Sequence, residues 1–377
     1  MPKIRILVVD DSVVVRRMLS DALTADPQLE VVGTAANGKI ALAKIPQVNP
    51  DIVILDVEMP ELDGIGTLVG IRKSSPALPV IMYSTLTQRG AEATLEALSR
   101  GATDYVTKPS NVGSVAQALE CIRVQLIPKI KAICGGVLGL FQPSLPLVPM
   151  VSKAPVPSSV FPRPVERIDI VAIGVSTGGP NALASLIPNL PPDLPAPVVI
   201  VQHMPPVFTR LLAERLAAKS QVGVEEGHQG AVLKPGCAWI APGDYHMVVA
   251  NDHQQVVLRT HQGPPENSCR PAVDVLFRSV ASVYKSHALA VVMTGMGQDG
   301  LRGCEHIREA GGQILVQDQA TSVVWGMPGF VANAGLADRV LPLDQLAMEI
   351  IYRARSGRNS MRGLRSAPWS MESSVPK

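Results

Sequence analysis

The sequence predicts two doubly wound α/β domains, each built on a parallel sheet, with a proline-rich segment between them. Two long stretches alternate short apolar runs, which have the length of buried strands, with segments of helical length. Strict alternation of this kind is typical of parallel sheets that helices cover on both faces. Between the two stretches, prolines interrupt every periodic pattern, so we expect a semi-extended linker over 126–166.

The first domain is expected over 1–125. Its apolar runs predict five strands, at 4–9, 31–32, 52–55, 80–83 and 104–106. Each piece between two runs has the length of one helix, which is the pattern of consecutive β-α-β units.

The alternation resumes in a second domain, expected over 167–352. Its apolar runs predict strands at 168–173, 198–202, 238–241, 246–249, 256–258, 288–293 and 313–316. The segment 237–258 has the pattern of an antiparallel insertion, because turn-forming residues at 242–244 and 251–252 separate short strands. Arg, Ser and Gly dominate from 353 to 377, where we expect a disordered basic tail.

Composition narrows the class of protein. With 377 residues, 46% of them hydrophobic, the chain can form large cores, and a net charge of +2 provides no general attraction to nucleic acid or membrane. The 5 cysteines include no Cys-x-x-Cys pair, which argues against a zinc site or a disulfide framework and indicates a reducing compartment. We find no signal peptide and no run long enough to insert into a membrane, so we expect a cytoplasmic protein.

Charged and hydroxyl residues follow the strands of the first domain. Asp10 and Asp11 end the first strand, Asp56 the third, Ser84 the fourth and Lys108 the fifth. Because parallel strands end at one edge of their sheet, we expect these side chains to gather there. Each aspartate alone could be an ordinary helix cap or turn residue. Together, three carboxylates predict a Mg²⁺ site, in which the central Asp56 could attack a phosphoryl group.

With this motif set, residues 1–125 resemble a response-regulator receiver domain of the flavodoxin-like fold. The resemblance implies that Asp56 accepts phosphate from a partner histidine kinase. It implies that Asp10, Asp11, Asp56 and the backbone at Glu58 hold Mg²⁺. It also implies that Ser84, Tyr105 and Lys108 form the conformational switch, with a cis peptide bond between Lys108 and Pro109.

The second domain begins with a glycine-rich turn, Gly-Val-Ser-Thr-Gly-Gly-Pro at 174–180, between an apolar run and a helical segment. Glycines allow a sharp strand-to-helix turn that exposes the central Ser176. Backbone N–H groups at the start of the helix could stabilise an oxyanion. Such a turn could also cap a helix or bind a dinucleotide phosphate. A dinucleotide site, however, would need a glycine in place of Ser176 and an acidic residue after the next strand.

The next strand ends instead at His203, and a histidine one strand away from an exposed serine is suited to accept its proton. A later strand runs into the turn Thr-Gly-Met-Gly-Gln-Asp-Gly, which contains Asp299. Ser176, His203 and Asp299 therefore lie on loops at one sheet edge, and we predict a Ser-His-Asp relay. Other histidines compete as the base, and we expect them in or near the insertion: His228, His246, His253 and His261.

Six segments of residues 168–345 resemble the catalytic domain of the chemotaxis protein-glutamate methylesterases. They are Ile-Gly-Val-Ser-Thr-Gly-Gly-Pro, Gln-His-Met-Pro-Pro, Ala-Pro-Gly-Asp-Tyr-His-Met, Arg-Pro-Ala-Val-Asp-Val-Leu-Phe, Thr-Gly-Met-Gly-Gln-Asp-Gly and Gly-Met-Pro. The resemblance implies a Rossmann-like domain, with Ser176 as nucleophile, His203 as base and Asp299 as the orienting carboxylate. It suggests oxyanion donors at the Met296 backbone and around Thr177. Val175 stands where the family usually has a smaller alanine.

The same resemblance implies the reaction and its control. The substrate would be a glutamyl methyl ester of a methyl-accepting chemotaxis receptor, with methanol as the product and no cofactor for the ester chemistry. Deamidation of receptor glutamines would use the same groups. The unphosphorylated receiver domain would cover the catalytic cleft, and phosphorylation of Asp56 would loosen that contact.

Two other functions remain open from the sequence. The second domain could bind a receptor without catalysis, which substitution of Ser176 would reveal. A receiver domain can also precede a DNA-binding domain, but no helix-turn-helix pattern follows this one and the net charge of +2 is close to neutral. We therefore expect no nucleic-acid partner.

Overall fold

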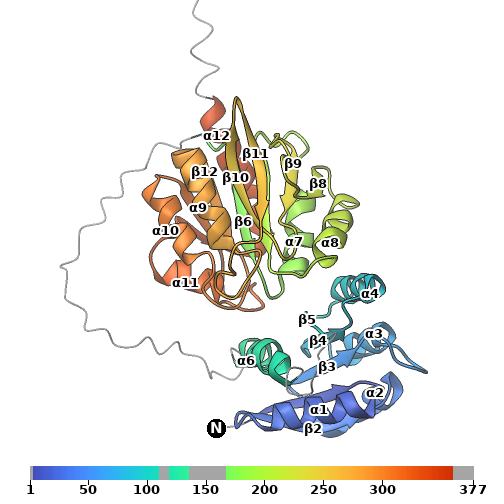
Figure 1. Cartoon of the computed structure of the whole chain (residues 1–377). Coiled ribbons are helices and arrows are strands. Elements are labelled where there is room, and N and C mark those ends of the chain that lie inside the picture. Colours follow the sequence, from blue (N-terminus) through green and yellow to red (C-terminus); the bar gives the residue numbers. More distant parts are fainter. Residues whose placement is uncertain (1–2, 110–118, 136–166, 360–377) are drawn as a thin grey trace, which may run out of the picture.

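The computed structural model describes residues 3–109, 119–135 and 167–359, which form two α/β domains (Figure 1). The first, coloured blue to cyan, contains the amino terminus, and the second runs from green to red. Most of the predicted proline-rich linker and most of the predicted basic tail lie outside the described residues. Within the described residues, no helix has both the length and the apolar composition needed to cross a bilayer.

The first domain is a five-stranded parallel sheet of order β2-β1-β3-β4-β5. Its strands are β1 (Ile4–Val9), β2 (Leu29–Ala35), β3 (Ile52–Asp56), β4 (Val80–Ser84) and β5 (Asp104–Thr107). The helices that connect them are α1 (Val13–Thr24), α2 (Gly38–Val48), α3 (Gly64–Ser74) and α4 (Gln88–Ser99). All five predicted strands are confirmed, with β2 longer at both ends than its apolar core.

Part of the expected linker is helical, so the prediction of a semi-extended segment is wrong there. A π-helical turn, η1 (Ile122–Leu126), continues into α6 (Ile127–Gly135). Leu126 is buried with Ile130 against the strands of the first domain. The prolines that suggested a linker concentrate beyond this helix, and Pro128 stands in its first turn, where a missing N–H costs little.

The second domain has a seven-stranded parallel sheet of order β14-β13-β12-β6-β7-β9-β8. Its strands are β6 (Ile170–Val175), β7 (Val198–Gln202), β8 (Gly223–Glu226), β9 (Cys237–Ile240), β12 (Ala288–Val292), β13 (Gln313–Gln317) and β14 (Arg339–Leu341). The helices are α7 (Gly179–Leu186), α8 (Phe208–Ala217), α9 (Val273–Tyr284), α10 (Leu301–Glu309), α11 (Met327–Asn333) and α12 (Leu343–Asn359). Because the order reverses between β6 and β12, their carboxyl ends flank a topological switch point, where such folds bind ligands.

The expected antiparallel insertion is smaller than predicted. Of the strands expected in it, β10 (His246–Asp252) and β11 (Gln255–His261) pair in an antiparallel ribbon. β9 instead pairs parallel to β7 and β8 in the main sheet. The turn after β9 suggested that β9 pairs with the next strand in the chain. A turn does not determine which strands pair, however, because pairing depends on the tertiary structure. Two short strands, β8 and β14, were not predicted.

Two further expectations are wrong. The basic tail was expected from 353, but α12 continues to Asn359, and Arg353 in this helix donates to the side chain of Gln313 of β13 at 2.7 Å. The expected cis bond before Pro109 is absent. Among the described residues, the cis peptide bond precedes Pro271.

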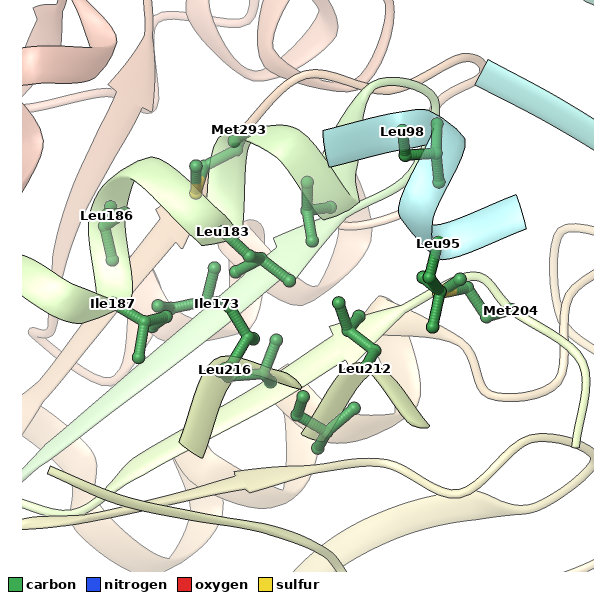
Figure 2. Packing of buried hydrophobic residues seen from close by; sticks show 14 of the residues in the cluster. Leu95, Leu98, Ile173, Leu183, Leu186, Ile187, Met204, Leu212, Leu216 and Met293 are labelled. Carbon is green, nitrogen blue, oxygen red and sulfur yellow. The ribbon is translucent and has the colours of Figure 1, made fainter. Parts of the chain in front are cut away.

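The two domains share an apolar contact that continues the core of the second domain. Helix α4 of the first domain packs against α7 and α8 of the second. Figure 2 shows Leu95 of α4 beside Met204, and buried side chains of α7 and α8 near them. A ring stack at 4.9 Å joins Tyr105 to Phe208, and the Asn181 side chain donates to the carbonyl of Ala102 at 3.0 Å.

The central strand β6 has no room for a side chain at Gly174. A Cβ added there would lie 2.4 Å from Cγ1 of Val273, at the start of α9. We expect Gly174→Ala to lower the free energy of unfolding by about 1–3 kcal/mol, because the core is overpacked. Urea unfolding followed by tryptophan fluorescence measures this, since Trp239 and Trp325 lie in the same domain.

The matched control is Gly223→Ala in the edge strand β8, where the nearest atom to an added Cβ is 3.7 Å away. We expect this variant to unfold within about 0.5 kcal/mol of the wild type. Equal unfolding curves for the Gly174 and Gly223 variants would contradict the packing argument.

Candidate active site

Ser176 lies in the turn between β6 and α7, at the carboxyl edge of the second sheet. Its backbone N–H donates to the carbonyl of Thr294 at 3.0 Å. Its carbonyl accepts from the N–H of Gly179 at 2.8 Å and from Nε2 of Gln202 at 3.0 Å. The turn is therefore tied to the two neighbouring strands, which holds the partly exposed Ser176 in place.

Two glycines make this placement possible. Gly178 has a φ of +76°, which a residue with a Cβ rarely adopts. At Gly295, a Cβ would lie 2.8 Å from the Cβ of Ser176 and 2.4 Å from Sδ of Met327. The loop after β12 can thus approach the serine turn closely only because residue 295 has no side chain.

His203 follows β7, directly beside the serine turn. Its N–H donates to the carbonyl of Val175 at 3.3 Å, so the chain leaves the sheet at neighbouring positions on β6 and β7. Nε2 of His203 bonds Oδ2 of Asp299 at 2.8 Å. Nδ1 contacts Sγ of Cys269 at 3.6 Å. Among the described residues, the Ser176 hydroxyl has no hydrogen-bond partner, so the predicted bond between nucleophile and base is not formed in this arrangement.

Asp299 is the most firmly held member of the predicted relay. It is 2% exposed, in the loop between β12 and α10. The first two N–H groups of α9, from Val273 and Asp274, donate to its carboxylate at 2.7 and 3.0 Å. Asn267 donates to Oδ1 at 2.9 Å. A carboxylate at a helix amino terminus is stabilised by these N–H groups and by the helix dipole.

The charges of this pair follow from its hydrogen bonds. Burial raises the pKa of Asp299, but the bond and charge of His203 and the N–H groups of α9 outweigh burial and hold the pKa below its usual value. Burial lowers the pKa of His203, but Asp299 and Cys269 outweigh burial and raise the pKa to about 10. The carboxylate is therefore ionised, and the ring is protonated at neutral pH in this arrangement.

Of the two predicted oxyanion donors, Thr177 follows Ser176 in the chain, and Met296 follows Gly295, whose backbone lies against the Ser176 side chain. Within the described residues, the backbone N–H groups of Thr177 and Met296 donate no hydrogen bond. Thr177 is 2% exposed, and the peptide that carries its N–H is held through the Ser176 carbonyl, which accepts from Gly179 and Gln202. Free N–H groups beside a candidate nucleophile are the donors that an acyl-transfer site needs.

The competing histidines do not contact Asp299. His246 is buried and bonds the carbonyl of Pro264 and the N–H of Ala272, so its ring is a structural element. His261 packs against it with ring centroids 5.3 Å apart. His253 is exposed in the turn of the β10–β11 ribbon, and His228 packs edge-on against Trp239.

Three residues that support the site were missed by the sequence interpretation. Asn267 bridges Asp274 and Asp299, and the carboxylate of Asp274 accepts the N–H groups of Gly300 and Gly303. Burial and the charge of Asp299 raise the pKa of Asp274. Cys269 touches the imidazole. An acidic residue shortly after a proline at a helix start is a sequence signal for Asp274, but nothing local marks Asn267 or Cys269.

The acidic residues of the first domain also come together. Carboxylate oxygens of Asp10, Asp11 and Asp56 all lie within 4.8 Å of one another. Nζ of Lys108 bonds Asp10 at 2.9 Å and Asp56 at 2.8 Å. Burial, opposed by Lys108, raises the pKa of Asp56 to about 6. Hard oxygen donors in this number fit Mg²⁺.

A cavity of about 220 Å³ opens beside this cluster, and Glu58 and Ser84 are among the residues that line it. The Ser84 hydroxyl donates to the carbonyl of Gly90 at 3.0 Å rather than towards Asp56. Tyr105 is 5% exposed, with its ring against Phe208 of the second domain. Of the predicted switch residues, Lys108 therefore lies in the acidic cluster and Tyr105 lies at the contact between the domains.

The link between Asp299 and His203 can be tested without an activity assay. We expect Asp299→Asn to lower the pKa of His203 by about 1–3 units, because the neighbouring negative charge is removed. The measurement is an NMR titration of the His203 ring in the full chain. The same titration of Asp338→Asn is the control, because that carboxylate bonds Arg308 rather than an imidazole. An unchanged His203 pKa would contradict the ion pair.

Each of the two domains matches a known protein family. The family model described as CheB methylesterase matches residues 171–350, and that of the response regulator receiver domain matches residues 6–120. The catalytic domain of Thermotoga maritima CheB methylesterase, a solved structure, is 44% identical, with a TM-score of 0.48, and covers 49% of this chain and 97% of that chain.

Two relatives match almost the whole chain, and both are named protein-glutamate methylesterase/protein-glutamine glutaminase. The protein from Trichodesmium erythraeum is 58% identical over 353 residues, which are 94% of this chain and 99% of the relative. The protein from Nocardioides sp. is 51% identical over 374 residues, which are 96% of this chain and 98% of the relative. With its receiver domain and its second α/β domain both matched, the chain belongs to the CheB methylesterase family.

Proposed function

We propose that this chain is a phosphorylation-regulated protein-glutamate methylesterase that acts on methylated chemoreceptors in the cytoplasm. The observation that carries the proposal is the bond of 2.8 Å between His203 and the buried Asp299, directly beside the Ser176 turn. An imidazole oriented by a carboxylate at the edge where a serine is exposed can perform acyl transfer. Names of relatives that match 94% and 96% of the chain support the same activity.

The reaction begins with attack by Oγ of Ser176 on the ester carbonyl of a methylated glutamate. Nδ1 of His203 accepts the serine proton, because Nε2 is engaged by Asp299. Attack therefore requires that Nδ1 first loses its proton and its contact with Cys269. The oxyanion that forms on the carbonyl oxygen accepts the N–H groups of Thr177 and Met296.

The intermediate collapses when the protonated His203 donates to the methoxy oxygen, and methanol leaves. Water then attacks the acyl-enzyme, with His203 as base, and the receptor glutamate is released with its carboxylate. A glutamine side chain passes through the same tetrahedral oxyanion and loses ammonia instead of methanol. Deamidation of receptor glutamines is therefore the second activity of the same site.

The receiver domain supplies the control. In this proposal Asp56 accepts a phosphoryl group from a histidine kinase, while Asp10, Asp11 and the backbone at Glu58 hold Mg²⁺. The metal ion, when bound, offsets the negative charge of the phosphoryl oxygens. Lys108 already bonds Asp10 and Asp56, and its ammonium group can form an ion pair with the phosphoryl oxygens once Asp56 is phosphorylated.

The contact between the domains supports inhibition of the unphosphorylated enzyme. Met204 follows His203 in the chain and packs against Leu95 of the receiver (Figure 2). Met296, a proposed oxyanion donor, packs with Val324 against the core of the receiver. The receiver therefore contacts segments on both sides of the site, where it restricts the approach of a helical receptor.

Tyr105 couples the phosphorylation site to this contact. The residue lies in β5, the strand that leads to Lys108, and its ring stacks on Phe208 with an angle of 7° between the planes. A change in the position of Tyr105 alters the packing at the start of α8, the helix that follows His203. Phosphorylation then shifts a population of closed molecules towards open ones, by as much as the phosphate's contacts differ between the two states.

Substitution of Ser176 by alanine tests the catalytic proposal. We expect Ser176→Ala to reduce methanol release from methylated receptor on the order of 10⁶-fold, because the nucleophile is lost. Receptor binding should be retained, which a pull-down of the full chain with receptor measures. Ser279→Ala is a suitable control, since that hydroxyl bonds backbone groups of the second domain away from the turn. Full activity in Ser176→Ala would exclude the acyl-enzyme.

A charge placed in the domain contact tests inhibition. Leu95 is 3% exposed in the full chain, and an aspartate there would be buried without a partner. We expect Leu95→Asp to raise methanol release by the unphosphorylated enzyme on the order of tenfold. Leu86→Asp, on the same domain, is the control because Leu86 is 41% exposed. Inhibition by the receiver is wrong if both variants keep wild-type activity and a phosphodonor still activates them.

A further inference from the structure

A tight turn at 266–269 lies over the His203–Asp299 pair. Glu266 and Cys269 exchange two backbone hydrogen bonds, at 3.1 and 2.8 Å. Asn267 and Ser268 between them have φ values of +51° and +61°, as a two-residue turn of this hand requires. Arg278 holds the Glu266 carboxylate with two bonds. The turn therefore fixes the directions of the side chains that it presents to the site.

Two of these side chains reach the opposite ends of the pair. Asn267 bonds the carboxylate of Asp299, and Sγ of Cys269 lies 3.6 Å from Nδ1 of His203. An ionised carboxylate can only accept, so Nε2 donates to Asp299 and Nδ1 faces the sulfur. The result is a Cys269–His203–Asp299 array, in which a thiol occupies the position that the Ser176 hydroxyl must reach during catalysis.

When the His203 ring is neutral, a thiol in this position can transfer its proton to Nδ1. Proton transfer leaves a thiolate beside an imidazolium, and the imidazolium is stabilised by Asp299. The thiolate is the nucleophilic form of cysteine, and a neighbouring His⁺ favours it. The distance of 3.6 Å between Sγ of Cys269 and Nδ1 of His203 places the two partners of this transfer side by side.

The other cysteines have different surroundings. Cys134 and Cys304 are buried, and burial raises the pKa of both thiols, that of Cys134 to about 12. Cys121 and Cys237 are partly exposed like Cys269, but within the described residues neither has a hydrogen bond to a histidine. Among the five, Cys269 alone combines access with a contact to an imidazole in the part of the chain that the structure describes.

We propose that Cys269 is a reactive thiol of the active site and that hydroperoxides modify it, which reversibly switches the esterase off. The inference rests on the proposed role of His203 as base. The Cys269 thiolate attacks one oxygen of hydrogen peroxide, so that an S–O bond forms and the O–O bond breaks. The departing hydroxide takes the proton from Nδ1 and becomes water. Sulfur loses two electrons, peroxide gains two, and a sulfenic acid remains.

The sulfenic acid inhibits because of its location. Its added oxygen lies beside Nδ1 of His203, where Ser176 must deliver its proton. A second thiol can convert the sulfenic acid to a disulfide and then regenerate Cys269. The modification would therefore act on the catalytic base directly, without the receiver domain.

Alkylation of the full chain tests the reactivity of Cys269. An ordinary thiol is about one-tenth thiolate near pH 7.5, so a thiol held as thiolate reacts about tenfold faster. We expect iodoacetamide to label Cys269 about tenfold faster than Cys237, measured by mass spectrometry of the peptides. His203→Ala should remove this difference, because the imidazole is absent. Equal rates for Cys269 and Cys237 in the wild type would overturn the proposal.

Peroxide inactivation tests the consequence. We expect wild type and Cys237→Ser to lose methanol release in step with sulfenic acid at Cys269, and to recover with dithiothreitol. The activity that Cys269→Ser retains should be insensitive to peroxide. If Cys269→Ser does not fold, the relation between Cys269 oxidation and activity in the wild type decides the question. Loss of activity without oxidation of Cys269, or oxidation without loss, would refute the switch.

The labelling result is independent of the esterase assay. If Ser176→Ala proved fully active, the proposed function would fail while the reactivity of Cys269 could still be measured. If Cys269 reacted slowly in an enzyme that depends on Ser176, only the thiol proposal would fail.

Discussion

The proposed catalytic site depends on the interactions of one buried carboxylate, that of Asp299. A carboxylate with 2% exposure is stable as an anion only if donors replace the lost water. Here five donors do so: the ring of His203, the amide of Asn267 and the backbone N–H groups of Val273, Asp274 and Gly300. Backbone N–H groups at the amino terminus of α9 thus hold the anion that bonds His203, the proposed base.

The same carboxylate connects otherwise separate parts of the second domain. His203 comes from the end of β7, Asp299 from the loop after β12, and the donors from α9 and the turn before it. Gly174 allows α9 to pack directly on β6, since any Cβ there would collide with Val273. The packing of α9 on β6 therefore also determines the electrostatics of the site, because a shift of α9 would move the N–H groups that bond Asp299.

Both proposed forms of regulation, inhibition by the receiver domain and oxidation of Cys269, would act at or near Nδ1 of His203. In the described arrangement it contacts Cys269, while the receiver packs on Met204 and Met296 at either side of the site. In the proposed mechanism, this arrangement would combine a covered site with a base whose second ring nitrogen is already in contact with a thiol. The receiver would control access to the site, and the thiol would control the base.

Local sequence predicted the strands except β8 and β14, the glycine turns and the residues of both candidate sites, because apolar period, turn chemistry and strand ends are properties of short segments. Ser176, His203, Asp299 and the cluster around Asp56 follow from strand ends in parallel sheets. Only the tertiary structure decided the pairing of β9, the packing of α6 on the receiver and the positions of Asn267 and Cys269. These depend on contacts between segments far apart in the chain, which no local pattern encodes.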